Sequence, residues 1–261
     1  MKKFLVILFL TIIVITAVVL LIIYLNKSKE KLTFNQNHFG ENDFYVEIED
    51  ALSPEECDLI INNSRDKLIH SKVMSNDKNN NGKEDKNSRT SYQTWLENRK
   101  YKNIINKVTK LVNKFKKNYT IIDPNQYEET QVVRYKPTQE YKQHYDICHP
   151  IQGNKEHFSA CLEDYKKNKS VRYATVIFYL NDGYEGGETY FPRLNKKIIP
   201  KKGKALIFFN CNFNEDTKKS GLCDVIYNSE HAGLPIIESN KSNAINEKWI
   251  ATVWVRAKKR I

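Results

Sequence analysis

Cysteine, proline and glycine are all scarce in this chain of 261 residues. Its five cysteines are too few for a small domain that depends on disulfides for stability. Its seven prolines and nine glycines exclude a collagen-like or linker protein. The sequence also lacks an arginine-rich stripe, zinc-finger spacing and an aromatic RNA-binding signature. We therefore do not expect nucleic acid as a partner.

The composition that remains is typical of a folded domain. Hydrophobic residues make up 40% of the chain and charged residues 28%, which excludes a wholly disordered chain and a membrane protein with many spans. The net charge of +11 comes from scattered lysines, which indicates a solvated surface. The length is sufficient for one large domain with a substantial core.

The N-terminus contains the only long hydrophobic run. Residues 4–24 carry no charge, and at 1.5 Å per residue a helix of this length spans about 32 Å, close to the hydrocarbon thickness of a bilayer. No small-residue cleavage site follows. We predict an uncleaved signal anchor over residues 1–28, a polar stem over residues 29–40 and a catalytic domain over residues 41–261. The alternative is a signal peptide with an unusual cleavage site.

The orientation of this anchor is less sharply indicated by the sequence. Lysines flank the apolar run on both sides, so the positive-inside rule gives nearly a tie. Glycosylation sequons favour a type II protein, in which the catalytic domain faces the endoplasmic reticulum or secretory lumen. They begin at Asn62, Asn118, Asn168 and Asn240.

Local signals predict two helices followed by many strands. Ser53-Pro54-Glu55-Glu56 has the N-cap, first-turn proline and N3 glutamate of a helix start, and residues 99–117 have apolar side chains at helical spacing. Residues 75–88 are polar throughout and predict a surface loop. Short runs rich in β-branched and aromatic residues follow, separated by turn signals. The pattern predicts an α+β domain with a β-sandwich or barrel core, with strands over 131–135, 171–180, 204–210 and 249–256.

Two histidines are candidate metal ligands. His144 and Asp146 are two residues apart, so in a strand both point to the same face. A distant His231 would complete two imidazoles and one carboxylate, a set that binds Fe(II) and leaves positions open for substrates. Taken alone, each histidine is more often a structural residue.

The neighbouring sequence resembles the Fe(II)- and 2-oxoglutarate-dependent prolyl 4-hydroxylases. The similar blocks occur in the family's order and extend over about residues 50–256. They are residues 52–57 (LSPEEC), Arg89-Thr90-Ser91 with Trp95-Leu96, residues 134–146 (RYKPTQEYKQHYD), residues 179–192 (YLNDGYEGGETYFP), residues 201–209 (KKGKALIFF), and His231-Ala232-Gly233-Leu234-Pro235 with Lys241 and Lys248-Trp249.

The resemblance implies a double-stranded β-helix (jelly-roll) core with flanking helices, and roles for particular residues. His144, Asp146 and His231 would ligate Fe(II). The co-substrate 2-oxoglutarate would be held by Lys241 through its distal carboxylate, together with Tyr135 and Thr189. The peptide substrate would contact Tyr141, Arg89 and Trp249.

The implied reaction is hydroxylation of prolyl residues at C4 in proline-rich or collagen-like polypeptides. It would be coupled to decarboxylation of 2-oxoglutarate to succinate, with L-ascorbate rescuing oxidised iron. One alternative is the same chemistry on another acceptor. A second is a catalytically silent, membrane-tethered binding protein, although the intact His144, Asp146, His231 and Lys241 argue against it.

The chain departs from the family pattern at several positions. Thr138 stands where the family has a glycine, and Leu234 where it often has cysteine. The interval from Lys241 to Lys248-Trp249 is two residues longer than usual, which puts the loop over residues 242–246 in doubt.

The cysteines suggest two disulfides. Cys148 could pair with Cys161, and Cys211 with Cys223, which leaves Cys57 over. The alternative is five reduced, partly buried thiols.

Overall fold

A computed structural model describes most of the C-terminal part of the chain. The described residues are Thr16 and residues 44–73, 83–113, 119–121, 127–148, 163–213, 223–239 and 245–259. The chain divides into two units, Met1–Phe39 and Gly40–Ile261. The predicted anchor and stem lie outside the described residues apart from Thr16. Within the described part, no helix is long and apolar enough to cross a membrane, so the anchor stays a prediction.

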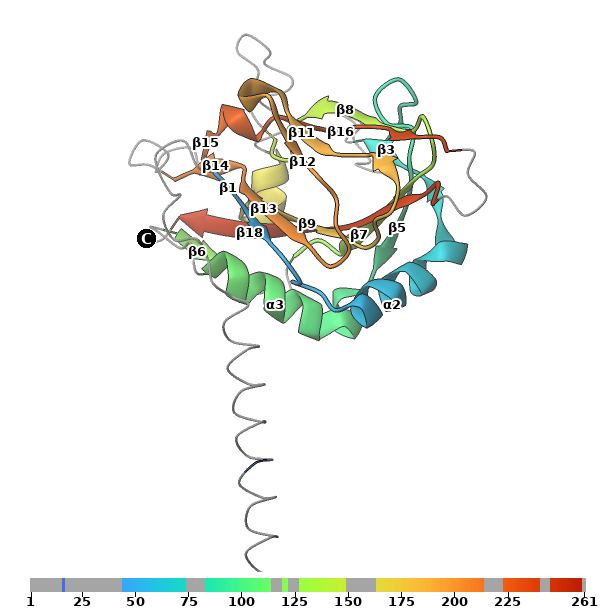
Figure 1. Cartoon of the computed structure of the whole chain (residues 1–261). Helices are drawn as coiled ribbons and strands as arrows, with labels where there is room; N and C mark the ends of the chain where they lie inside the picture. Colours follow the sequence, from blue (N-terminus) through green and yellow to red (C-terminus); the bar gives the residue numbers. More distant parts are fainter. Residues whose placement is uncertain are drawn as a thin grey trace, which may run out of the picture. The chain divides into compact units, whose positions relative to one another are not determined.

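Two antiparallel sheets form the second unit (Figure 1). The larger has eight strands. In spatial order these are β1 (Tyr45–Ile48), β13 (Ala205–Phe209), β9 (Val171–Tyr179), β18 (Lys248–Lys259), β7 (Thr130–Tyr135), β5 (Tyr92–Leu96) and β2 (Ile69–His70), with β6 (Tyr119–Ile121) paired to β18. The smaller has β12 (Lys196–Ile198), β11 (Thr189–Phe191), β16 (His231–Gly233) and β8 (Tyr141–His144).

Three short two-stranded pairs complete the strands of the described residues. They are β10 (Glu185–Gly186) with β17 (Ile236–Ile237), β14 (Cys211–Asn212) with β15 (Asp224–Val225), and β3 (Lys72–Val73) with β4 (Lys83–Glu84). The last pair alters one prediction, because residues 83–84 of the predicted polar loop form a strand. Residues 75–82 of that loop lie outside the described residues.

The hydrophobic core draws on both sheets, which is the reason they stack. Side chains at alternate positions along each strand point to one face, so each sheet contributes one apolar surface. The core includes Tyr135 of β7, Tyr179 of β9, Phe191 of β11 and Phe208 of β13, all 2% exposed or less. This two-sheet core with few helices is the predicted jelly-roll architecture.

Two helices cover the outer face of the larger sheet, α2 (Pro54–Ser64) and α3 (Lys102–Asn113) (Figure 1). The predicted cap of α2 is confirmed: the Glu56 N–H donates to Ser53 Oγ, and the Ser53 N–H donates to Glu56 Oε2 at 2.8 Å. Single-turn 3₁₀ helices lie at Arg65–Lys67, Asn98–Tyr101, Pro192–Leu194 and Tyr227–Ser229.

The second helix begins later than predicted. The sequence predicts a helix from Arg99, whereas Asn98–Tyr101 form a 3₁₀ turn and α3 starts at Lys102. The Asn98 side chain accepts hydrogen bonds from both the N–H and the hydroxyl of Thr130. This attachment to β7 holds the chain in a tighter turn before the helix can begin. Residues 114–117 of the predicted helix lie outside the described residues.

One predicted disulfide is confirmed. Cys211 and Cys223 are bonded, with their Cα atoms 5.7 Å apart, and this bond links β14 to the residue preceding β15. Cys148 is also disulfide-bonded, while its predicted partner Cys161 lies outside the described residues. Cys57 is a free, buried thiol, and burial raises its pKa to about 11.

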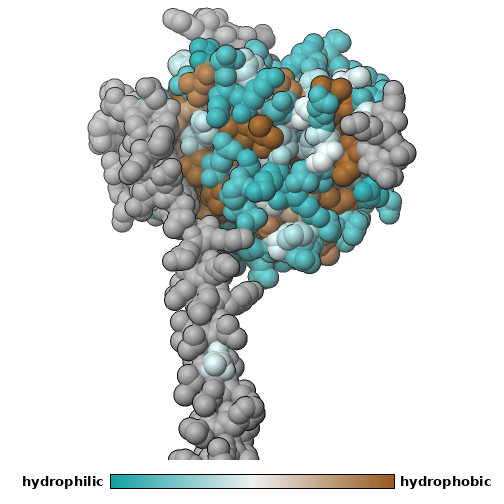
Figure 2. Space-filling model, viewed as in Figure 1, coloured by the Kyte–Doolittle hydropathy of each residue, from teal (hydrophilic) through white to brown (hydrophobic). Residues whose placement is uncertain are grey.

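The surface of this unit is mainly polar. On the face shown in Figure 2, hydrophilic residues predominate and the hydrophobic ones lie in small, separate patches. Single exposed hydrophobic side chains such as Ile199 are usual on folded proteins.

Candidate active site

The smaller sheet brings the three predicted metal ligands together. His144 is the last residue of β8 and His231 the first of β16, and the antiparallel register places them directly opposite each other. Asp146 follows β8 by two residues. The ligand atoms of the three side chains all lie within 4.8 Å of one another. His144 Nε2 is 3.6 Å from Asp146 Oδ1, and His231 Nε2 is 3.8 Å from Asp146 Oδ2.

Backbone carbonyls orient both imidazole rings. His144 Nδ1 lies 2.7 Å from the Lys142 carbonyl oxygen, and His231 Nδ1 lies 2.9 Å from that of Ser229. Since a carbonyl only accepts, Nδ1 carries the proton and Nε2 presents its lone pair towards Asp146. Burial and the neighbouring His144 lower the pKa of His231 to about 4, so this imidazole is neutral at pH 7. Metal binding requires that state.

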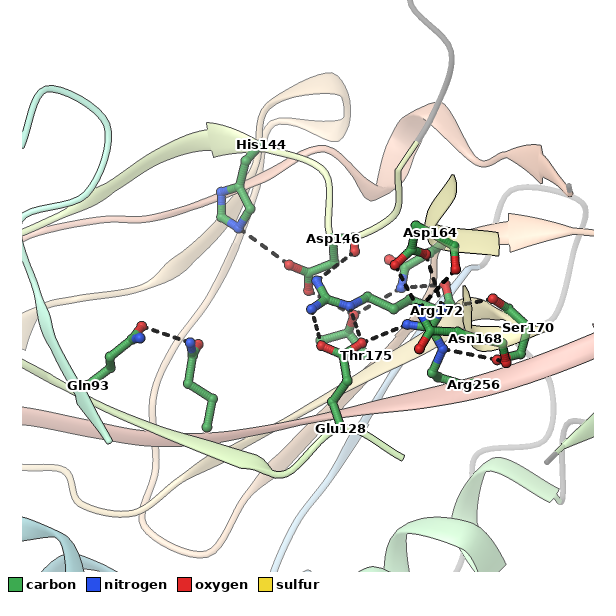
Figure 3. Close-up of polar contacts among 12 residues, drawn as sticks. Gln93, Glu128, His144, Asp146, Asp164, Asn168, Ser170, Arg172, Thr175 and Arg256 are labelled. Carbon is green, nitrogen blue, oxygen red and sulfur yellow. Dashed lines mark hydrogen bonds and ion pairs between the residues drawn. The ribbon is translucent and has the colours of Figure 1, made fainter. Parts of the chain in front are cut away.

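Asp146 is held ionised. Burial alone would raise its pKa, but His231, His144 and Arg172 together hold the pKa of this carboxyl well below its usual range. The Thr175 hydroxyl donates to Asp146 Oδ2 at 2.8 Å, and Arg172 Nη1 donates to its backbone carbonyl at 3.1 Å. Figure 3 shows His144, Asp146 and Arg172 in this arrangement. Two imidazoles and one carboxylate fit Fe(II) and leave coordination positions open.

A buried ion network supports the segment after the metal ligands, and sequence reasoning missed it. Glu128 pairs with both Arg172 and Arg256, and Arg256 also reaches Asp164 at 3.1 Å (Figure 3). Although burial opposes it, the two guanidinium groups lower the pKa of Glu128. The available signal was an arginine within each of two mainly apolar runs, residues 171–180 and 249–256. Such a charge requires a buried partner.

A cavity of about 520 Å³ lies beside the metal ligands, within the usual size range of ligand sites. It is lined by all three ligands and by one face of β18. Because side chains alternate along a strand, every second residue of β18 faces it. These are Lys248, Ile250, Thr252, Trp254 and Arg256.

Lys248 is a buried cation in this cavity. Its side chain is 1% exposed, and Nζ lies 4.9 Å from the centroid of the Tyr135 ring. Among the described residues, no carboxylate lies within ion-pair distance of Nζ. Burial lowers the pKa of Lys248 to about 7, against a weaker opposing effect of Glu188. Lys241, which the sequence predicts for the co-substrate, lies outside the described residues.

The local geometry allows the Lys248 stem to reach the cavity. A side chain at Gly187 would bring its Cβ to 3.2 Å from Lys248 Cδ and to 2.8 Å from Ile236 Cγ2. Gly187 also has φ +72°, which side-chain-bearing residues rarely adopt. A glycine at this position therefore leaves room for the lysine.

Tyr135 and Thr189 line the same cavity as Lys248. Tyr135 pairs with Lys248 across β7 and β18, and burial raises its pKa. Thr189 Oγ1 lies 2.8 Å from the Tyr179 hydroxyl and is nearly buried. The structure thus places Tyr135 next to Lys248, and Thr189 on the wall of the same cavity.

The predicted peptide contacts separate into two groups. Arg89 and Tyr141 both line the cavity: the Arg89 guanidinium carbon lies 4.5 Å from the Tyr141 ring centroid, and that ring stacks on His144 with centroids 3.5 Å apart. Trp249 is not part of this group. It points to the opposite face of β18 from Lys248, donates to Glu247 Oε2 and lies under the Arg65 guanidinium.

The turn before β8 keeps its left-handed residue despite the departure noted in the sequence. Thr138 has φ 66°, a conformation that a β-branched residue adopts at some cost. The Gln139 N–H donates to the Lys136 carbonyl at 3.0 Å and closes the turn. The threonine therefore occupies the conformation for which glycine is best suited.

Comparisons with known proteins agree with this site. Residues 130–256 match the model of the 2OG-Fe(II) oxygenase superfamily. A putative prolyl 4-hydroxylase of Acanthamoeba polyphaga mimivirus is 33% identical over 81% of this chain and 74% of its own length. A probable prolyl 4-hydroxylase of Arabidopsis thaliana is 31% identical over 80% of this chain, which spans 61% of that protein.

A solved structure shows the same fold. The viral collagen prolyl hydroxylase of Paramecium bursaria Chlorella virus-1, in its 2-oxoglutarate complex, is 29% identical. The alignment has a TM-score of 0.55 and covers 83% of this chain and 97% of that one. On this sequence identity and the assembled metal ligands, the chain belongs to the prolyl 4-hydroxylase family of 2OG-Fe(II) oxygenases.

Proposed function

We propose that the protein hydroxylates prolyl residues at C4 in proline-rich or collagen-like polypeptides, coupled to oxidative decarboxylation of 2-oxoglutarate to succinate and CO₂. The observation that carries the proposal is one cavity lined by two oriented imidazoles, one ionised carboxylate and a buried lysine that has no carboxylate partner among the described residues. The three ligands suit Fe(II), and the lysine suits the far carboxylate of a dicarboxylic co-substrate.

Lys248 is our choice for the residue that binds this carboxylate. An ammonium on the cavity wall, with Tyr135 beside it and Thr189 lining the same cavity, provides charge and hydrogen-bond donors together. Lys241 remains the prediction from the family resemblance. The two assignments differ because an interval counted from His231 is sensitive to loop length. The position of Lys248 does not depend on that loop length, because this residue begins a buried strand.

Each remaining residue has a separate task. When bound, the iron and 2-oxoglutarate supply the oxidising chemistry, and L-ascorbate returns inactive iron to the ferrous state. His144, Asp146 and His231 hold the metal. Arg89 and Tyr141 form the wall on the peptide side and limit the access of water.

The test is hydroxylation by the purified full chain supplied with Fe(II), 2-oxoglutarate and ascorbate. Proline-rich and (Pro-Pro-Gly)-type peptides should gain the mass of one oxygen atom on proline. His231→Ala should abolish this gain, because one imidazole and one carboxylate hold the iron too weakly. Succinate formed without peptide oxidation would indicate another acceptor. Neither bound iron nor succinate in the wild type would contradict the proposal and favour a silent binding protein.

We also propose that residues 1–28 anchor the protein as a type II membrane protein, with the catalytic domain in the secretory lumen. The apolar run of residues 4–24 and the Cys211–Cys223 disulfide support this location, because disulfides persist in oxidising compartments. In membrane vesicles, the catalytic domain should resist added protease until detergent is present. Digestion without detergent would contradict the orientation.

A further inference from the structure

A line of polar side chains crosses the cavity away from the iron ligands. Arg89 Nη2 donates to Gln131 Oε1 at 3.0 Å, and Gln131 Nε2 donates to Gln93 Oε1 at 2.8 Å. Figure 3 shows Gln93 joined to this neighbouring amide. Gln93 lies on β5 and Gln131 on the adjacent β7, and all three side chains line the cavity.

The direction of these hydrogen bonds is fixed by Arg89. A guanidinium only donates, so Gln131 must turn its amide oxygen to Arg89 and its nitrogen to Gln93. Gln93 then accepts through its oxygen, which leaves its own Nε2 as a donor. Among the described residues, no acceptor lies within hydrogen-bond distance of this nitrogen. Gln93 is only 3% exposed, so the cavity is the remaining direction in which a partner can lie.

We propose that Gln93 Nε2 donates a hydrogen bond to a backbone carbonyl of the peptide substrate. This inference rests on the proposed function. Proline has no N–H, so a proline-rich peptide offers carbonyl acceptors but few donors, and the protein must supply the donors.

The neighbouring side chains fit the same occupant. Trp95 lies two residues further along β5 on the same face, lines the cavity and is 42% exposed. Its ring centroid is 6.0 Å from that of Trp254. An aromatic surface beside a fixed donor is the usual way in which proteins bind an extended polyproline II segment.

The hydrogen-bonded line also connects this donor to the metal site. Arg89 lies over Tyr141, and Tyr141 stacks on the iron ligand His144. Gln93 therefore holds a peptide carbonyl at a set position relative to the iron. It is a positioning residue that determines which proline lies at the metal.

Two substitutions in the full chain test this role. Gln93→Met removes the donor at similar length. Gln93→Glu keeps an oxygen for Gln131 but replaces the donor by an acceptor. We expect the affinity for a labelled (Pro-Pro-Gly) repeat to fall, and its KM to rise, by about tenfold in Gln93→Met and by more in Gln93→Glu. The KM for 2-oxoglutarate and peptide-independent succinate formation should not change.

The matched control is Thr94→Val, a nearly isosteric change on the opposite face of β5 that should leave peptide affinity unchanged. A second readout replaces the amides that precede glycine by esters, one at a time, because an ester carbonyl is a weaker acceptor. One ester should weaken binding to the wild type and not to Gln93→Met.

Equal peptide affinity in both Gln93 variants and the control would overturn the proposal. So would an equal loss of succinate formation without peptide, because Gln93 would then support the metal site itself. A wild type that binds peptide without oxidising it would contradict the proposed function alone, since the affinity comparison would still hold.

Discussion

Two buried cations lie at opposite ends of the cavity-facing side of β18, and their surroundings differ completely. Arg256 pairs with Glu128 and Asp164 and donates twice more to Ser170, so its charge is neutralised within the chain. Lys248 has an aromatic ring and, among the described residues, no carboxylate within ion-pair distance. The difference indicates that the first cation serves the fold and the second serves a negatively charged ligand.

The largest expected effect is on stability at the paired cation. Arg256→Met removes a guanidinium that is 3% exposed and leaves the partly buried Glu128 and Asp164 with one cation fewer, which should lower the free energy of unfolding by about 2–3 kcal/mol. Denaturant unfolding measures this, with Arg256→Lys as the charge-retaining control. A loss below about 1 kcal/mol, typical of an exposed pair, would show that the network is not needed for stability.

Lys248→Met should have the opposite profile. The KM for 2-oxoglutarate should rise by about 100-fold, because a charge-assisted contact to the far carboxylate is lost. Stability without co-substrate should be unchanged or higher, since an unpaired buried charge is removed. Steady-state succinate formation and denaturant unfolding of the same preparation give both quantities. If Lys248→Met were strongly destabilised but had a normal KM for 2-oxoglutarate, Lys248 would serve the fold and not the co-substrate.

The third effect is a pH dependence that only the unpaired cation can cause. The pKa of Lys248 is about 7 in the folded protein, below its unfolded value of about 10.4. Between these values the unfolded chain binds more protons, so Lys248 makes stability rise with pH by about 1.4 kcal/mol per unit. Below pH 7, Lys248 is protonated in both states and does not change the dependence of stability on pH. The difference between wild type and Lys248→Met, measured from pH 6 to 9, isolates this contribution; parallel curves would refute it.

The smallest effect is expected where solvent screens the charge. Lys107 Nζ lies 2.6 Å from Glu56 Oε2, with side chains 42% and 27% exposed. Lys107→Met should change the free energy of unfolding by less than about 1 kcal/mol. Thermal unfolding beside Arg256→Met tests whether burial, rather than ion pairing as such, sets the size of these effects. If Lys107→Met lowered the free energy of unfolding as much as Arg256→Met, burial would not set the size of these effects.

Sequence patterns predicted the parts of the molecule that depend on neighbours along the chain. The cap of α2 uses Ser53 and Glu56. His144 and Asp146 do lie together, but Asp146 is in a bend after the end of β8 and not in the strand that the sequence predicted. His231 was different. Its pairing with His144 depends on the register of two strands far apart in the sequence, so only the family resemblance placed it.

The parts that sequence analysis missed depend on distant contacts. Glu128 and Arg256 meet across many intervening residues, and nothing local identifies them as partners. Neighbouring strand residues face opposite ways, so Lys248 faces the cavity while Trp249 is buried on the other side of β18, and its predicted peptide contact stays a prediction. Lys241 lies outside the described residues, so its role at the co-substrate stays a prediction.

The KM for 2-oxoglutarate, measured side by side in Lys248→Met and Lys241→Met, tests the account most directly. The account predicts an increase of about 100-fold in Lys248→Met and no change in Lys241→Met. The reverse result would show that the co-substrate carboxylate binds Lys241. The buried charge at Lys248 would then have no ligand to explain it.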